Sequence, residues 1–118
     1  MKKLTEIARF TDNLPELTAF YRQLLGVEPA AQSEGMSIFM LGETKLFLHR
    51  TYSPKEGELP PENHLAFTVS DLDQACAGLT AAGLAIEIPP KDYYWGYSAY
   101  LRDPDGQLIE LIQADKAE

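Results

Sequence analysis

Hydrophobic and polar positions change period several times along the first half of the chain, and each period is typical of one kind of secondary structure. Residues 4–10 show some alternation, which favours a strand, and the run stops at Thr11–Asn13, whose side chains suit a turn or helix cap. Over 14–25 apolar residues recur every three or four positions, which predicts an amphipathic helix. Pro15 fits its first turn and Gly26 its C-terminal stop.

Three short apolar runs follow this helix, at residues 27–32, 36–41 and 45–50. Turn segments that contain glycine separate them, a pattern that predicts an antiparallel meander of three strands. The next stretch, 52–62, is rich in proline and charged residues. Its composition predicts a linker.

The same order of elements begins again after the linker. Residues 64–69 resemble a strand, 72–82 a helix, and three more apolar runs follow. Those runs are 84–88, 96–102 and 107–113. The chain is therefore an internal duplication of a βαβββ unit, in which Asp71 corresponds to Asp12.

This repeat predicts an α+β fold. We expect one domain over residues 1–118, made of a first βαβββ module at 1–51, the linker at 52–62 and a second module at 63–118. Each helix covers one face of its sheet, so the other face needs a partner. Two such modules can form a half-open curved β-sheet with a central cleft.

Composition and charge exclude several classes of partner. Ten Lys and Arg stand against 18 Asp and Glu, a formal charge of −8, and without a basic face we expect no nucleic-acid partner. No apolar run approaches the roughly 20 residues that span a bilayer, so we expect no membrane partner either. The single cysteine, Cys76, cannot form an internal disulfide. With no apolar signal segment at the start, a cytoplasmic protein is the default expectation.

One charged residue does not fit its strand. Glu110 lies in the run 107–113, and strand alternation places it on the same face as Leu108 and Ile112. A carboxylate on an apolar face needs a cation, a hydrogen-bond donor or a proton. The alternative is a solvent-facing side chain.

Three segments of the sequence carry a resemblance to a known family: TDNL through FYRQLLGV at 11–27, HLAFTVSD at 64–71 and DPDGQLIEL at 103–111. They resemble the vicinal oxygen chelate superfamily, which includes glyoxalase I, the extradiol dioxygenases, fosfomycin-resistance enzymes and the metal-free bleomycin-resistance proteins. The resemblance covers nearly the whole chain. Its motifs are specific for the fold rather than for one reaction.

The resemblance also implies a metal site. His64 and Glu110 match positions where metal-dependent members carry ligands, and the corresponding positions of the first module fall on Thr5 and near His49. Thr5 is a poor ligand, and Glu6 would require a one-residue slip of the strand. The sequence thus departs from the glyoxalase I pattern, but His49, His64 and Glu110 together have the composition of a two-histidine, one-carboxylate site for Zn, Ni, Mn or Fe. Each histidine has a plain alternative as an exposed residue at a strand end.

Aromatic side chains crowd the segment that precedes the last two strands. We expect Tyr94 and Trp95 to line the cleft mouth and bind substrate, because loop aromatics with polar tips often meet a ligand. Core packing or a dimer contact is the alternative. Arg102 is a candidate for an anionic substrate group, or simply an exposed charge on a strand.

Two functions of different classes follow. The first is a glyoxalase-like metal-dependent enzyme that acts on a small oxygenated substrate by lyase, isomerase or dioxygenase chemistry. A metal-stabilised oxyanion would form, and Glu110 or a metal-bound water would move a proton. The second is a metal-free small-molecule-binding protein of the bleomycin-resistance type, which the imperfect ligand set and the aromatic loop favour. The resemblance also implies a homodimer.

Overall fold

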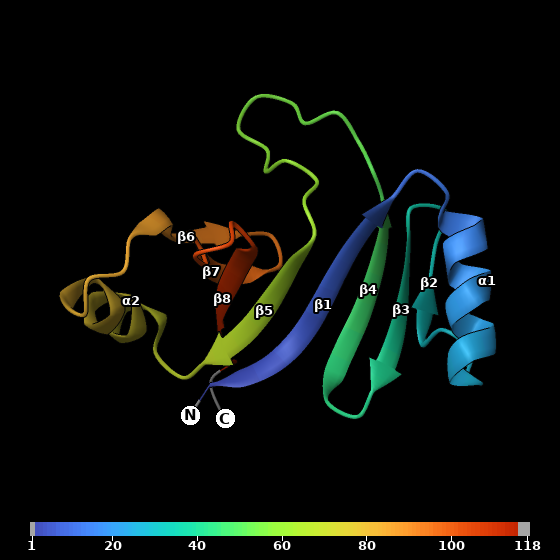
Figure 1. Ribbon diagram of the computed structural model, residues 1–118, viewed down its shortest axis with the longest axis horizontal. Helices are drawn as coiled ribbons and strands as arrows, with labels where there is room; N and C mark the ends of the chain where they lie inside the picture. The colour runs from blue at the N-terminus through green and yellow to red at the C-terminus, as the bar shows by residue number, and fades with distance from the viewer. Residues whose placement is uncertain (1, 116–118) are drawn as a thin grey trace. The chain divides into compact units, whose positions relative to one another are not determined.

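Side chains that alternate along the strands divide each sheet into a face that packs on a helix and a face that does not. A computed structural model describes residues 2–115, which fall into two units (Figure 1). The N-terminal unit is Glu6–Asn63, and the C-terminal unit contains the residues from His64 onward together with those up to Thr5. Each unit is a β-sheet with one helix, so the predicted α+β class and the two βαβββ modules are confirmed.

The N-terminal unit contains four strands and one helix in the order βαβββ. Its sheet has the strand order β2-β3-β4-β1, with β1 parallel to β4 and the other neighbours antiparallel. The elements are β1 (Lys3–Thr11), α1 (Leu14–Leu25), β2 (Ala31–Gln32), β3 (Met36–Leu41) and β4 (Thr44–Arg50).

Helix α1 ends and packs as its sequence predicts. Gly26 takes a left-handed conformation with φ 70°, and its N–H donates to the carbonyl oxygen of Arg22 at 2.9 Å. A buried core lies between the helix and the sheet, and a hydrogen bond of 2.9 Å joins the buried hydroxyls of Thr18 and Ser37 within it. The core residues are Leu14, Phe39, Leu46 and Leu48.

The C-terminal unit repeats the order, and its sheet runs β5-β8-β7-β6 with β5 parallel to β8. Its helix begins at a true cap, because the carboxylate of Asp71 accepts the N–H of Gln74 at 3.1 Å. The elements are β5 (His64–Val69), α2 (Leu72–Ala81), β6 (Ile86–Tyr93), β7 (Gly96–Arg102) and β8 (Leu108–Gln113).

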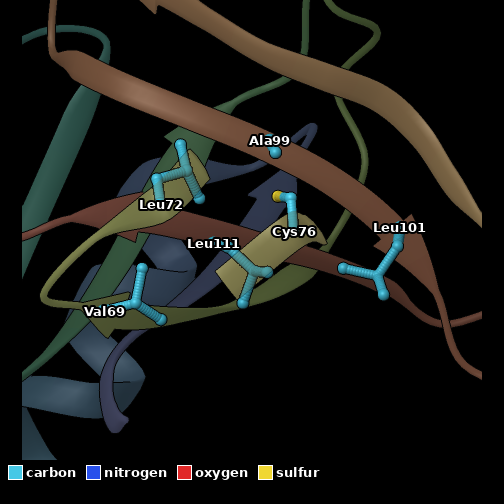
Figure 2. Close-up of a cluster of buried hydrophobic side chains, with 6 residues drawn as sticks. All are labelled: Val69, Leu72, Cys76, Ala99, Leu101 and Leu111. Atoms are coloured by element: carbon cyan, nitrogen blue, oxygen red, sulfur yellow. The ribbon is translucent and has the colours of Figure 1, made fainter. Parts of the chain in front are cut away.

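The core of this unit fixes which strand residues face α2. Figure 2 shows the buried cluster: Val69, Leu72, Cys76, Ala99, Leu101 and Leu111. Because alternate residues point to opposite faces, Ser98 and Glu110 on the neighbouring strand positions lie on the face away from α2. Burial, and to a lesser degree the charge of Asp73, raises the pKa of the Cys76 thiol, as expected of a structural cysteine.

Strand β6 differs from its predicted bounds. We expected a strand at 84–88 and a loop from Lys91 to Gly96, but β6 extends to Tyr93 and leaves only a two-residue connection before β7. Pro89 and Pro90 lie inside it, where the pairing with β7 shifts register. An edge strand tolerates proline because one side of it has no hydrogen-bonded neighbour. The predicted bounds of this strand were therefore wrong at its C-terminal end, because the edge position lets the strand continue through Pro89 and Pro90.

Among the described residues, no helix is long and apolar enough to cross a membrane.

The buried hydroxyl pair in the N-terminal unit gives a test of its packing. Ser37→Ala should lower the free energy of unfolding by about 1–3 kcal/mol, because the Thr18 hydroxyl is left buried without its partner. The double variant Thr18→Val/Ser37→Ala should lose less than the two single losses added together. Urea denaturation of the wild type, Ser37→Ala, Thr18→Val and the double variant measures this coupling. Strictly additive losses of unfolding free energy would contradict it.

Candidate metal centre

The candidate centre lies on the face of the C-terminal sheet that points away from α2. His64 is the first residue of β5 and Glu110 lies in the middle of β8, its parallel neighbour. The strand register pairs His64 with Leu108 and Ala66 with Glu110, so the two side chains share a face two positions apart. The Nε2 atom of His64 lies 3.2 Å from Oε1 of Glu110. Pairing of β5 with β8 thus brings together the two residues with the best match to ligand positions.

Glu110 is buried, with 4% of its surface exposed, and it does not lack partners. Its Oε1 atom faces His64, while Oε2 accepts a hydrogen bond of 2.8 Å from the Ser98 hydroxyl and one of 3.1 Å from the Trp95 indole N–H. These three donors explain how a carboxylate is accommodated on an apolar strand.

The same contacts decide the charge of Glu110. Burial is the largest influence and raises its pKa, but hydrogen bonds from His64, Ser98 and Trp95, together with the charge of His64, outweigh it. The net result is a lowered pKa. Glu110 is therefore a carboxylate at neutral pH, which is the form that ligates a metal ion.

Aromatic rings complete a closed circuit around this pair. Trp95 stacks on Tyr93 with ring centroids 4.5 Å apart and planes 7° apart, and Tyr93 meets Tyr100 edge-on at 6.1 Å. Tyr100 in turn meets the His64 ring edge-on at 6.3 Å. Five side chains from β5, β8 and the β6–β7 hairpin therefore each contact the next, which restrains the orientation of both His64 and Glu110.

Two of the predicted substrate-binding residues have other surroundings. Tyr94 is 97% exposed and touches Trp95 edge-on at 4.8 Å. The Arg102 guanidinium donates to Glu87 at 3.1 Å and to the carbonyl oxygen of Gly106 at 3.0 Å. Their roles toward a substrate stay predictions.

His49 belongs to the N-terminal unit. Its ring lies among aromatic side chains, with centroids 5.4 Å from Phe10, 5.5 Å from Phe47 and 5.9 Å from Tyr52. Its Nδ1 atom is 2.6 Å from the carbonyl oxygen of Arg50. Because Nδ1 is engaged, Nε2 is the atom that remains for ligation, and His49 as a ligand stays a prediction.

Thr5 is engaged in a structural contact rather than ligation. Its hydroxyl lies 2.8 Å from the Thr68 hydroxyl and 3.5 Å from the carbonyl oxygen of Ala66. Both partners are on β5, the strand that begins with His64. These bonds attach the start of β1 to the C-terminal unit.

The donor set of the centre fits a divalent transition metal. An imidazole nitrogen and a carboxylate oxygen are borderline ligands that suit Zn, Ni, Mn or Fe. Two atoms that each bind one ion at about 2.1 Å are roughly 3.0–3.4 Å apart at octahedral to tetrahedral angles. The 3.2 Å between Nε2 and Oε1 falls in that range.

Sequence reasoning missed Ser98 and the hydrogen bond of Trp95. Ser98 was detectable in principle, because it is a lone polar residue inside the otherwise apolar run 97–101. Its partner was not detectable, since the contact depends on the pairing of β7 with β8. Trp95 was predicted to bind substrate, whereas in the structure its indole N–H donates to Glu110.

Comparison with known proteins identifies relatives over nearly the whole chain. The sequence model of the Glyoxalase/Bleomycin resistance protein/Dioxygenase superfamily matches residues 3–111. Metallothiol transferase FosB from Shouchella clausii is 30% identical over an alignment of 112 residues, and the match covers 90% of this chain and 76% of that protein.

Solved structures show the same fold. Methylmalonyl-CoA epimerase from Streptomyces coelicolor matches with a TM-score of 0.69 and 22% identity, covering 98% of this chain and 96% of the other. A superfamily member from Vibrio splendidus matches with a TM-score of 0.67 and 16% identity, covering 97% of this chain and all of the other (100%).

The lowered pKa of Glu110 predicts a specific loss of stability in acid. A depressed carboxyl pKa contributes stability that is present above the ordinary value of 4.5 and is lost as the pH falls through the folded-state value. In metal-free protein, the free energy of unfolding should therefore fall more steeply below pH 4.5 in the wild type than in Glu110→Gln. Denaturant titrations over this range measure it. Glu87→Gln, which removes an exposed carboxylate, is the control, and equal acid sensitivity of wild type and Glu110→Gln would contradict the assignment.

Proposed function

This chain belongs to the Glyoxalase/Bleomycin resistance protein/Dioxygenase superfamily, and we propose that it is a metal-dependent enzyme of that superfamily acting on a small oxygenated substrate. The observation that carries the proposal is the His64–Glu110 pair, 3.2 Å apart. Its carboxylate is buried and its second oxygen already has two donors. A half-buried imidazole and a buried carboxylate at this spacing support the proposal, because their orientation suits two ligands of one ion.

A third protein ligand is needed, because catalytic sites of this kind hold the ion with three side chains and leave a position open. We propose Glu6, and His49 is the competing candidate. Glu6 follows Thr5, whose hydroxyl bonds Thr68 on the strand that begins with His64. Glu6 also offers the oxygen donor of a carboxylate. The site would then have one imidazole and two carboxylates.

The chain's own residues support ligation more directly than proton transfer. A bound divalent ion would supply Lewis acidity that stabilises developing negative charge on a substrate oxygen. Oε1 is the Glu110 atom that can bind or take a proton, because Oε2 accepts two hydrogen bonds. The lowered pKa makes Glu110 a weak base, so its proposed catalytic role is to hold the ion and, at most, relay a proton briefly.

Metal binding by purified variants tests this function. Protein stripped by dialysis against a chelator should bind Zn²⁺, Ni²⁺, Mn²⁺ or Fe²⁺ in a calorimeter with one ion per chain. His64→Ala and Glu110→Gln should each lose binding by at least about 100-fold, because each removes a protein ligand or its charge.

The third ligand is identified by a matched pair of variants in the same experiment. Glu6→Gln should weaken binding by about 100-fold, because it removes the charge of a ligand, and His49→Ala should leave binding within about twofold, because it removes neither a ligand nor a residue that orients one. The reverse result would assign His49. Wild-type protein that binds none of the four ions would refute the metal-dependent function.

A metal-free small-molecule-binding protein is the second candidate. One observation favours it: on the N-terminal unit, the His49 ring has its centroid 5.4–5.9 Å from the rings of Phe10, Phe47 and Tyr52, and Phe10 and Tyr52 are 6.2 Å apart. Such rings can bind planar or cationic compounds. Thermal stabilisation by planar ligands in the presence of chelator, without stabilisation by metals, would favour this candidate over the enzyme.

The assembly and location are also proposals. We propose that the protein forms a homodimer, as the family resemblance implies, and that it works in the cytoplasm. Light scattering after gel filtration measures the assembly, and a monomer at all concentrations would contradict it.

A further inference from the structure

The β6–β7 hairpin contains two residues, Trp95 and Ser98, that donate hydrogen bonds to Glu110 in the candidate centre. We propose that Trp95 and Ser98 are positioning residues that hold Oε2 of Glu110, so that Oε1 alone is presented to a divalent ion beside His64. Since Trp95 is the single tryptophan of the chain, its indole also reports whether the centre is occupied. This inference rests on the proposed metal-dependent function.

The first step is the hydrogen-bond capacity of one oxygen atom. Oε2 accepts from Ser98 at 2.8 Å and from Trp95 at 3.1 Å. A carboxylate oxygen has two lone pairs, so these donors use its acceptor capacity. Oε1 faces Nε2 of His64 instead. The two oxygens of Glu110 thus have different surroundings, and only one is arranged for an ion.

The second step is the rigidity of the donors. Ser98 is fully buried in the centre of β7. Trp95 is 41% exposed, but its indole stacks on Tyr93, and Tyr94 contacts it edge-on. Gly96, with φ 147°, follows it in a conformation that other residues rarely adopt. The indole N–H is therefore directed at Oε2 by packing as well as by the bond itself.

The third step concerns which ions the centre selects. With Oε2 held, Glu110 ligates through one oxygen, which suits small ions such as Zn²⁺ that take one oxygen per carboxylate. Ca²⁺ accepts both oxygens of a carboxylate at longer distances. Removal of the two donors should therefore weaken Zn²⁺ binding and lower the ratio of the Zn²⁺ affinity to the Ca²⁺ affinity.

Zn²⁺ titration of metal-free protein tests the positioning role. Trp95→Phe keeps a ring that can stack on Tyr93 but removes the N–H, and Ser98→Ala removes the hydroxyl. Each should weaken Zn²⁺ binding by about 10- to 100-fold in calorimetry, the usual cost of removing a residue that orients a ligand. Tyr97→Phe is the control, because it removes a hydroxyl that donates to Asp73 and its ring packs against the core on the α2 side of the sheet, and it should bind within about twofold of wild type. Thermal melting of each variant confirms folding.

A spectroscopic measurement on the wild type tests the same contact without the Trp95 and Ser98 variants. One indole N–H signal is expected in a ¹H–¹⁵N spectrum because there is one tryptophan. This signal and the tryptophan emission should both change with Zn²⁺, with the midpoint that calorimetry gives. Glu110→Gln should abolish the change.

The outcomes separate this inference from the proposed function. If wild type binds Zn²⁺ but Trp95→Phe and Ser98→Ala bind equally well, or the indole signal does not respond, the positioning role is wrong and metal binding stands. If wild type binds neither Zn²⁺ nor the other ions, the proposed function fails and the inference fails with it.

Discussion

The burial of one carboxylate, Glu110, constrains the architecture around it. An ionised group removed from water is costly unless donors or a cation compensate it, and here the compensation comes from three separate elements. His64 belongs to β5, Ser98 to β7 and Trp95 to the connection before β7. The C-terminal sheet must therefore keep both its strand order and its register for Glu110 to stay charged. A shift of one residue would turn the carboxylate toward the apolar core against α2.

The two faces of the C-terminal sheet have different roles, and this allows a small unit to accommodate a buried carboxylate. One face of the C-terminal sheet packs on α2 through a buried apolar cluster, which supplies hydrophobic stabilisation to this unit (Figure 2). The other face can carry groups that are unfavourable by themselves. Each of the five side chains in the circuit from His64 to Trp95 restrains the next. This reduces the side-chain conformational entropy that is lost when a ligand binds.

The sequence was enough to predict which strand face a residue occupies, but not which side chain is its hydrogen-bond partner. Alternation around Leu108 and Ile112 placed Glu110 on the correct face, and the motif at 64–71 selected His64. The hydrogen bond from Trp95 was beyond such reasoning, because it depends on the pairing of β6 with β7 through two register shifts, one between Ile86 and Ile88 and one between Ile88 and Lys91. Tyr94 and Trp95 are adjacent and chemically similar in sequence. Only the geometry of the connection separates an exposed ring from one that donates to Glu110.

The two modules share a fold but have taken different side chains at corresponding strand positions. Where the second module has His64 and Glu110, the first has Thr5 and the region of His49, which lies among the rings of Phe10, Phe47 and Tyr52. A second buried carboxylate would need its own set of donors from neighbouring strands, whereas aromatic rings satisfy one another by contact alone. Duplication supplies two equivalent frameworks, but within residues 2–115 the only buried carboxylate, with its hydrogen-bond donors, is Glu110 of the second module. The chemistry of a duplicated fold can therefore be asymmetric although its backbone is repeated.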